Sequence, residues 1–357
     1  MEPSEIVQNV NKINELLKSE DFDVVNSGLE LVKTLNEEAV YEKILESCGV
    51  DKEGRLVNEK KRLNTYLICV LSSLSNGNIA KEIKDNLTIL DLSNDDNLKN
   101  VDFLNSFTNI TSLNLNYCFS LINLNGLAQL TKLKELDLGI SKSLKDINGL
   151  ANLENLNKLY ICTPDYQEVD MDSYEGFKLP DGLSNLKNLT ILYIESTLIK
   201  NVDDLANLTN LLELDLEGCT KITNLDGLLK LTKLTDLSFW YGRSLTDISG
   251  LAHLKNLKNL DLSFCEEIND LSYLSDCLNL KSLVLRDCGV WNTDYKINVD
   301  FLSNLTNLTS LDLSGCINFQ IKPDNYSFDL KYEDGGETVI LKDDELKSYL
   351  KKIKTKL

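Results

Sequence analysis

The feature that most constrains this chain is a leucine pattern that returns about every 23 residues. Leu211, Leu214 and Leu216 form an LxxLxL run, Cys219 follows, and Ile222 and later leucines recur in steps of three. Shifting the window forward by 23 residues gives the same pattern. A fixed period of this length is typical of a solenoid built from stacked coils.

The spacing within one period predicts its local structure. In LxxLxL the last two leucines alternate with polar residues, so one side of an extended segment is apolar and the other faces solvent. The later steps of three predict a short 3₁₀ or extended return. One coil cannot bury its leucines alone, so we expect the coils to stack, with all strands in one parallel sheet on the concave face of an arc. Ten coils are predicted, and they begin at Leu87, Ile110, Leu133, Leu156, Leu189, Leu211, Leu234, Leu257, Leu280 and Leu308.

The repeat divides the chain into three predicted parts. Residues 1–86 lack it and carry amphipathic helical segments, with Gly49 expected to end a helix and residues 51–56 expected to form a turn. Residues 87–320 hold the repeats, with insertions within 163–178 and around 290–298. Residues 321–357 predict a hairpin followed by a helix over 345–354. We expect the first and last parts to cap the solenoid core.

Charge and cysteine use limit the partners and the compartment. The net charge is −19 and the sequence pI about 4.6, so phosphate backbones are repelled and nucleic acid is not an expected partner. No run of 18 apolar residues and no signal peptide are recognised, so we expect no membrane partner and a cytoplasmic location. The nine cysteines fall mostly at one repeat position, which predicts reduced thiols.

The run NLTNLLELDLEGCTKITNLDGLLKL, residues 207–231, resembles the short 22-residue class of leucine-rich repeats. Bacterial internalins and regulatory subunits of protein phosphatases belong to that class. The resemblance implies an α/β leucine-rich repeat solenoid: a right-handed arc with a parallel concave sheet of about ten strands, behind an N-terminal α-helical cap. It also implies protein binding on the concave face. This chain differs from internalins in carrying Cys where they usually carry Asn, and it shows no catalytic region like that of leucine-rich ubiquitin-ligase effectors.

The repeated cysteine position has a structural and a chemical interpretation. Buried free cysteines act as small hydrophobic residues with a weak donor, whereas clustered thiolates bind metals. No CxxC motif and no nearby histidine supports a zinc site. We therefore expect buried thiols, no metal and no cofactor. The position is held by Cys118, Cys219, Cys265, Cys288 and Cys316.

Other motifs give no sign of catalysis. His253 is the only histidine, so a Ser-His-Asp or Cys-His site would depend on it, and no GxxxxGK[ST] loop is present. Residues 170–176 resemble the start of a calcium loop, but Glu175 stands where that loop needs Gly and Asp181 where it needs Glu. We predict that the chain is not an enzyme and that this segment is a surface loop.

Aromatic residues at outward strand positions indicate a binding face. Aspartate is common at these positions in this repeat class, but Tyr160 and Tyr193 share one position on adjacent coils, and Trp240 follows a nearby strand. Exposed Trp, Tyr and Arg dominate interface energies, although Tyr241 or Phe264 can also pack under its own loop. The predicted protein-binding residues are Tyr160, Tyr193, Glu195, Asp215, Glu217, Trp240, Tyr241, Asp261, Phe264 and Arg286.

These observations predict a non-enzymatic module that binds a partner protein through aromatic anchors in an acidic surround. Acidic residues near the anchors favour a basic partner. Two alternatives stay open at this point. One is a secreted or host-delivered effector or adhesin of internalin type, and the other is a regulatory subunit of an enzyme complex.

Overall fold

A computed structural model gives the fold of two compact units, Met1–Leu156 and Asn157–Leu357. It describes residues 2–17, 19, 22–35, 37–58, 65–96, 98–141, 143–144, 147–162, 183–195, 199–289, 297–316, 319–320, 331–333, 336–338 and 340–342. Each unit is described by itself below. The predicted insertion within 163–178 and the predicted helix over 345–354 lie outside these residues.

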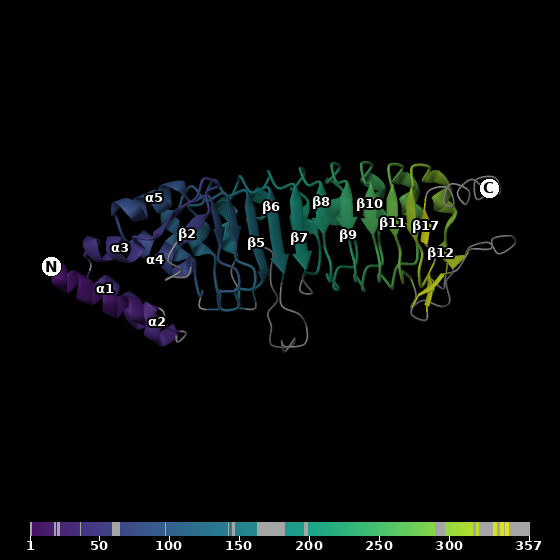
Figure 1. The fold of residues 1–357 in the computed structure, drawn as a ribbon. Coiled ribbons are helices and arrows are strands. Elements are labelled where there is room, and N and C mark those ends of the chain that lie inside the picture. Colours follow the sequence, from purple (N-terminus) through teal and green to yellow (C-terminus); the bar gives the residue numbers. More distant parts are fainter. Residues whose placement is uncertain are drawn as a thin grey trace. The chain divides into compact units, whose positions relative to one another are not determined.

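The first unit begins with helices and continues into parallel strands (Figure 1). The helices bury residues spaced three or four apart, such as Val10, Ile13 and Leu17, which confirms the predicted amphipathic pattern. The helices are α1 (Pro3–Leu17), α2 (Phe22–Leu35), α3 (Glu38–Leu45), α4 (Thr65–Leu74) and α5 (Asn78–Asn86). The parallel strands are β3 (Ile89–Asp91), β4 (Ser112–Asn114) and β5 (Glu135–Ile140), and the 3₁₀ helices are η1 (Asp102–Ser106), η2 (Asn125–Leu127) and η3 (Asn148–Asn152).

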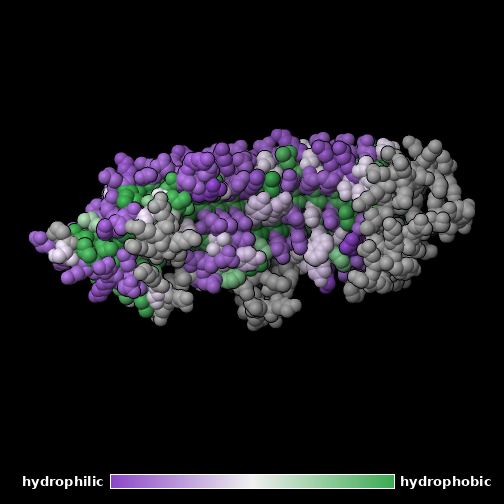
Figure 2. Space-filling view, in the orientation of Figure 1, coloured by the Kyte–Doolittle hydropathy of each residue, from purple (hydrophilic) through white to green (hydrophobic). Residues whose placement is uncertain are grey.

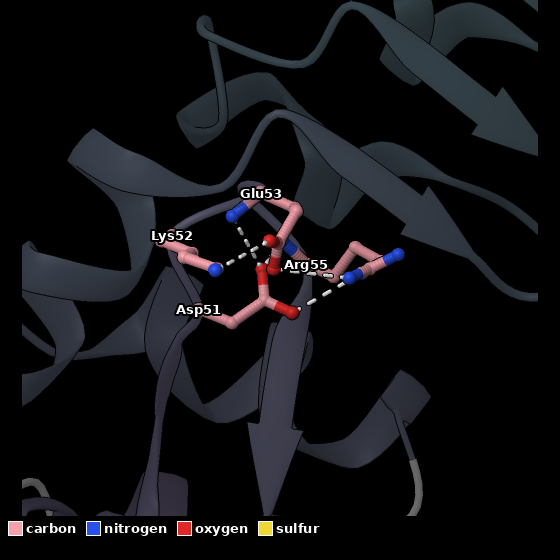
Figure 3. A network of polar contacts seen from close by, with 4 residues as sticks. All are labelled: Asp51, Lys52, Glu53 and Arg55. Atoms are coloured by element: carbon pink, nitrogen blue, oxygen red, sulfur yellow. Dashed lines mark hydrogen bonds and ion pairs between the residues drawn. The ribbon is translucent and has the colours of Figure 1, made fainter.

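A small antiparallel hairpin, β1 (Cys48–Val50) with β2 (Leu56–Asn58), interrupts the helices. The prediction that Gly49 ends a helix is wrong, because α3 ends at Leu45 and Gly49 pairs with Val57 in the hairpin. The predicted turn is confirmed: Asp51 Oδ1 accepts bonds from the backbone N–H of Glu53 and Arg55, at 3.0 and 2.9 Å (Figure 3). These bonds, that from Arg55 first, hold the pKa of Asp51 below its usual value.

The hairpin turn lies against the first strand of the unit. The carbonyl oxygen of Gly54 accepts hydrogen bonds from the backbone N–H groups of Thr88 and Ile89, both at 2.9 Å. Gly54 has a φ of +82°, a conformation that favours glycine, and an added Cβ would lie 1.8 Å from Thr88 Oγ1. The turn thus occupies part of the edge of β3, an edge that would otherwise offer unpaired backbone groups.

The second unit carries seven parallel strands in sequence order (Figure 1). They are β6 (Lys158–Cys162), β7 (Ile191–Glu195), β8 (Glu213–Asp215), β9 (Asp236–Ser238), β10 (Asn259–Asp261), β11 (Ser282–Val284) and β13 (Ser310–Asp312). The returns hold η4 (Leu183–Asn185), η5 (Asp203–Leu205), η6 (Asp226–Leu228), η7 (Ser249–His253), η8 (Ser272–Asp276) and η9 (Asp300–Asn304). Over the described residues of both units, ten parallel strands of the repeat each start two residues after a predicted coil start, and short 3₁₀ helices lie on the returns as predicted.

The core of each unit is a ladder of leucines in strict register. Leu214, Leu237 and Leu260 are direct neighbours on β8, β9 and β10, and each is at most 3% exposed. On the returns, glycine allows coils to approach closely: a Cβ on Gly227 would lie 2.2 Å from the carbonyl oxygen of Val202. Because the ladder repeats without a slip, every outward strand position lines up with its equivalent in the next coil.

The C-terminal part of the second unit adds short strands. The predicted hairpin is confirmed by β15 (Lys331–Glu333) pairing antiparallel with β16 (Gly336–Thr338). A further strand, β17 (Ile340–Lys342), pairs antiparallel with β13, although the sequence predicted residues 337–341 as a single strand of the hairpin. Two-residue strands β12 (Ile297–Asn298) and β14 (Phe319–Gln320) also pair. β17 occupies the outer edge of β13, which is the usual place for a chain to cover a sheet edge.

Candidate interaction surface

All ten residues predicted to bind protein lie in the second unit, on or directly after its parallel strands. We call the solvent-facing side of β6–β13 the strand face. Register places Tyr160 beside Tyr193 and Tyr193 beside Asp215, with Ser238 and Asp261 next in the same row. The regular alternation of strand side chains therefore brings these residues together, as the sequence predicts. Over these strands the surface is mainly hydrophilic, with paler and apolar patches set into it (Figure 2).

The two tyrosines form one aromatic pair. The ring centroids of Tyr160 and Tyr193 lie 4.8 Å apart with a tilt of 55°. The Tyr193 hydroxyl donates to Glu213 Oε2 at 3.1 Å. Burial, and then this acceptor carboxylate, raise the pKa of Tyr193 to about 12. The pair is thus held in place by contact between the two tilted rings and by a charge-assisted hydrogen bond.

Trp240, Tyr241 and Phe264 form a second aromatic group, which we call the aromatic triad. Trp240 stacks on Tyr241 at 5.4 Å between centroids and meets Phe264 edge-on at 5.6 Å. Tyr241 and Phe264, for which packing under their own loops was the alternative, are both half-buried. Trp240 is 38% exposed. The triad offers an aromatic surface already ordered in the free chain.

Arg243 is part of this group although sequence inspection did not single it out. Its guanidinium carbon lies 4.2 Å from the Tyr241 ring centroid, and its Nη2 donates to the Tyr241 hydroxyl. Its Nε lies 4.0 Å from Glu266. The only sequence signal was an arginine two residues after the tyrosine. Arg243 covers one side of Tyr241, so Trp240 is the ring of the triad most open to a partner.

An open hollow of about 260 Å³ lies on the strand face, over β7–β11. Tyr193 borders it, and carboxylates from neighbouring strands line it: Glu213, Asp215, Asp236 and Asp261. Glu213 and Asp236 were not among the predicted site residues, although their position facing solvent follows from the same alternation. Ser238 and Val284 also line the hollow.

Partial burial disfavours the charged form of two carboxyl groups at the hollow and next to it. Burial raises the pKa of Asp215, although the backbone N–H of Glu217 donates to its Oδ1 at 2.9 Å. Burial, followed by the charge of Asp215, also raises the pKa of Glu217. Glu195 lies at the edge of this region and accepts a bond from the Cys162 thiol at 2.9 Å. Of the ten predicted residues, Asp215 and Asp261 line the hollow with Tyr193.

Arg286 does not join the aromatic triad as its position suggested. Its Nη2 lies 3.2 Å from Asp312 Oδ2, on the neighbouring strand β13. Arg286 thus neutralises a carboxylate at the far end of the strand face. This ion pair is exposed on the arginine side and contributes little to stability by itself.

The repeated cysteines lie inside the coils. Cys118, Cys219, Cys265 and Cys288 are buried, Cys316 is half-buried, and all nine cysteines are free thiols. The Cys265 thiol donates to the carbonyl oxygen of Phe239 at 3.2 Å. Burial raises the pKa of Cys118 to about 11. Across the described ranges, no three His, Cys, Asp or Glu side chains are grouped as metal ligands would be.

Within the same ranges, no helix is long and apolar enough to cross a membrane.

Comparisons with known proteins found similarity to one family model and to several solved structures. A family model described as "Zer-1-like, Leucine-rich repeats" matches residues 248–332. No curated protein matches the chain at a significant level. Among solved structures, internalin C2 of Listeria monocytogenes is 24% identical, with a TM-score of 0.45, over 60% of this chain and 89% of that one.

Two further solved structures are similar to this chain. Internalin F of Listeria monocytogenes is 21% identical, with a TM-score of 0.43, over 84% of this chain and 90% of that one. The leucine-rich repeat domain of the type III effector XopL is 16% identical, with a TM-score of 0.43, over 78% of this chain and 90% of that one.

Proposed function

We propose that this leucine-rich repeat protein is a protein-binding module and that it recognises its partner with the strand face of the second unit. The single observation that carries the proposal is the aromatic triad beside the acidic hollow. Exposed tryptophan and tyrosine are enriched among the residues that dominate binding energy. Rings ordered before binding lose little entropy when a partner arrives.

Acidic residues around the rings favour a basic partner. The chain carries a net charge of −19, and four carboxylates line the hollow. Such a field speeds the approach of a basic surface and sets the salt dependence of binding. The proposed mechanism is recognition by a rigid surface, without a chemical reaction.

The test is affinity capture from the native cell with the full chain and with Trp240→Ala and Tyr193→Ala. Tyr273→Ala is the matched control, since Tyr273 is 39% exposed but lies on η8, away from the strand face. We expect each strand-face variant to weaken binding of the captured partner by about 2 kcal/mol or more, measured by calorimetry. Unchanged affinity in both, with loss on changes within residues 1–86, contradicts the proposal.

The free thiols support a reducing compartment, and we propose a cytoplasmic location on that basis. Disulfides are rare where glutathione keeps thiols reduced. Rapid alkylation of intact cells, followed by mass spectrometry, measures the redox state of the half-buried Cys48 and Cys316. We expect both as free thiols, and an intermolecular disulfide at either position contradicts this location.

A further inference from the structure

The acidic hollow brings carboxylates of like charge together on neighbouring strands. Glu213 on β8 is the direct register neighbour of Asp236 on β9. Like charges directly opposite each other on neighbouring strands are destabilising. Asp215 and Asp261 add two charges in the next row, separated by Ser238. Within the described part of the chain, no Lys or Arg forms an ion pair with any of these four carboxylates.

Hydrogen bonds from neighbouring strands fix these carboxylates without neutralising them. Tyr193 donates to Glu213, and Asn259 Nδ2 donates to Asp236. The donors are a hydroxyl and an amide, which carry no charge. A carboxylate offers about four acceptor sites, so each keeps capacity for a further donor. The hollow is therefore open, negatively charged and held in position.

The aromatic triad adds a second, independent feature next to the hollow. Trp240 follows β9, the strand that contributes Asp236, and the two lie four residues apart. At about 3.3 Å per residue, the Cα atoms of Asp236 and Trp240 are at most about 13 Å apart. One short segment of a partner can span that distance, whether extended or helical.

We infer that the strand face takes one peptide segment of the partner protein, with a Lys or Arg over Glu213 and Asp236 and a large apolar residue against Trp240. This inference rests on the proposed function and specifies the chemistry of the partner. The four carboxylates are spread over three strands, about 10 Å, which suits a cationic side chain with a long stem. Tyr193 supplies an aromatic wall for that stem, and a cation beside a ring is further stabilised.

The test uses a library of randomised peptides about 12 residues long, a length that spans the face in extended form. The library is selected in parallel on the full wild-type chain, on Glu213→Gln/Asp236→Asn, and on Trp240→Ala. The matched control is Asp204→Asn/Glu267→Gln, which removes the same charge at exposed positions away from the strand face. Thermal unfolding checks each variant, and we expect the hollow variant to be at least as stable as wild type because repulsion is relieved.

We expect the wild type and the charge control to enrich peptides that combine a basic and a large apolar residue. The hollow variant is expected to lose the basic preference and to bind the selected peptides at least tenfold more weakly. Peptides enriched on the wild type without a basic preference overturn the inference but leave the proposed function standing, provided that Trp240→Ala weakens them. Selected peptides whose affinity is unchanged by both Trp240→Ala and Tyr193→Ala overturn the proposed function as well. A selection that enriches no peptide also overturns it.

Discussion

Tyr241 and Phe264 hold backbone conformations that usually take glycine or asparagine. Their φ values are +66° and +58°. The equivalent position in other coils holds Asn94, Tyr117, Gly218, Asp287 and Gly315, all with positive φ. The conformation is costly for bulky side chains, and such strain collects where a residue serves a function. Aromatic residues thus recur at this position in three coils, and those at Tyr241 and Phe264 contribute to the aromatic triad.

Replacing Phe264 tests the strain. Phe264→Asn and Phe264→Ala both remove the contacts with Trp240 and Tyr241, but asparagine tolerates the left-handed conformation better than alanine. We expect Phe264→Asn to be more stable than Phe264→Ala by about 1 kcal/mol, measured by denaturant unfolding. An alanine variant that is as stable as the asparagine variant contradicts a strained position. Both variants are expected to weaken partner binding.

The raised pKa of Asp215 predicts how stability depends on pH. A carboxyl group whose pKa is raised by folding favours the folded state below its ordinary pKa, and this advantage is lost as pH rises through the raised value. We therefore expect Asp215→Asn to be more stable than wild type near neutral pH. The difference should shrink on acidification toward the ordinary pKa of aspartate, about 3.9, below which the carboxyl group is protonated in both states. Thermal melts across this range measure it, and a gap that widens in acid contradicts the assignment.

Residue by residue, sequence reasoning places strand positions well and side-chain partners poorly. Tyr160 and Tyr193 were predicted as neighbours because the repeat fixes their register. The stacking of Arg243 on Tyr241 and the pairing of Arg286 with Asp312 depend on side-chain conformation, which a period does not encode. Glu213 and Asp236, which pair on neighbouring strands, were not among the predicted site residues. The prediction therefore included only two of the four carboxylates that line the hollow.

At the scale of elements, the repeat predicts each strand but not the strand that covers the edge of the sheet. The ten parallel strands follow from the leucine spacing. β17 lies outside the repeat, and its pairing with β13 joins Leu311 to Leu341 in register. Such a contact between distant segments has no local pattern. The hairpin β1–β2 was also missed. Its strands lie outside the repeat and have only three residues each.

Proline substitution tests the role of β17. Ile340→Pro and Leu341→Pro each remove one backbone N–H, and in an antiparallel pair alternate residues point their N–H groups toward the partner strand. We expect the variant that loses the N–H facing β13 to be clearly less stable than the other. Exposure of the β13 edge should also cause association that increases with concentration, measured by light scattering. Equal behaviour of both variants, without association, contradicts an edge-covering role.

At the scale of the whole molecule, a solenoid distributes its stability along the chain. Each coil contacts its neighbours, so stability is close to a sum of coil terms and nearest-neighbour terms. Leu260 is 2% exposed in the ladder between β9 and β11. We expect Leu260→Ala to cost about 3 kcal/mol. Hydrogen exchange should show the largest loss of protection in β9–β11, and a uniform loss across the second unit contradicts this distribution.

The strict register of the ladder has a consequence for how such a surface changes. Tyr193 and Trp240 are carried by β7 and β9, and every strand between them adds one spacing of about 4.8 Å. Gain or loss of a whole coil by duplication or deletion shifts the anchors by that fixed increment and leaves the contacts inside each remaining coil intact. The distance between the two anchors therefore changes only in whole strand spacings. Changes finer than one step must come from the side chains.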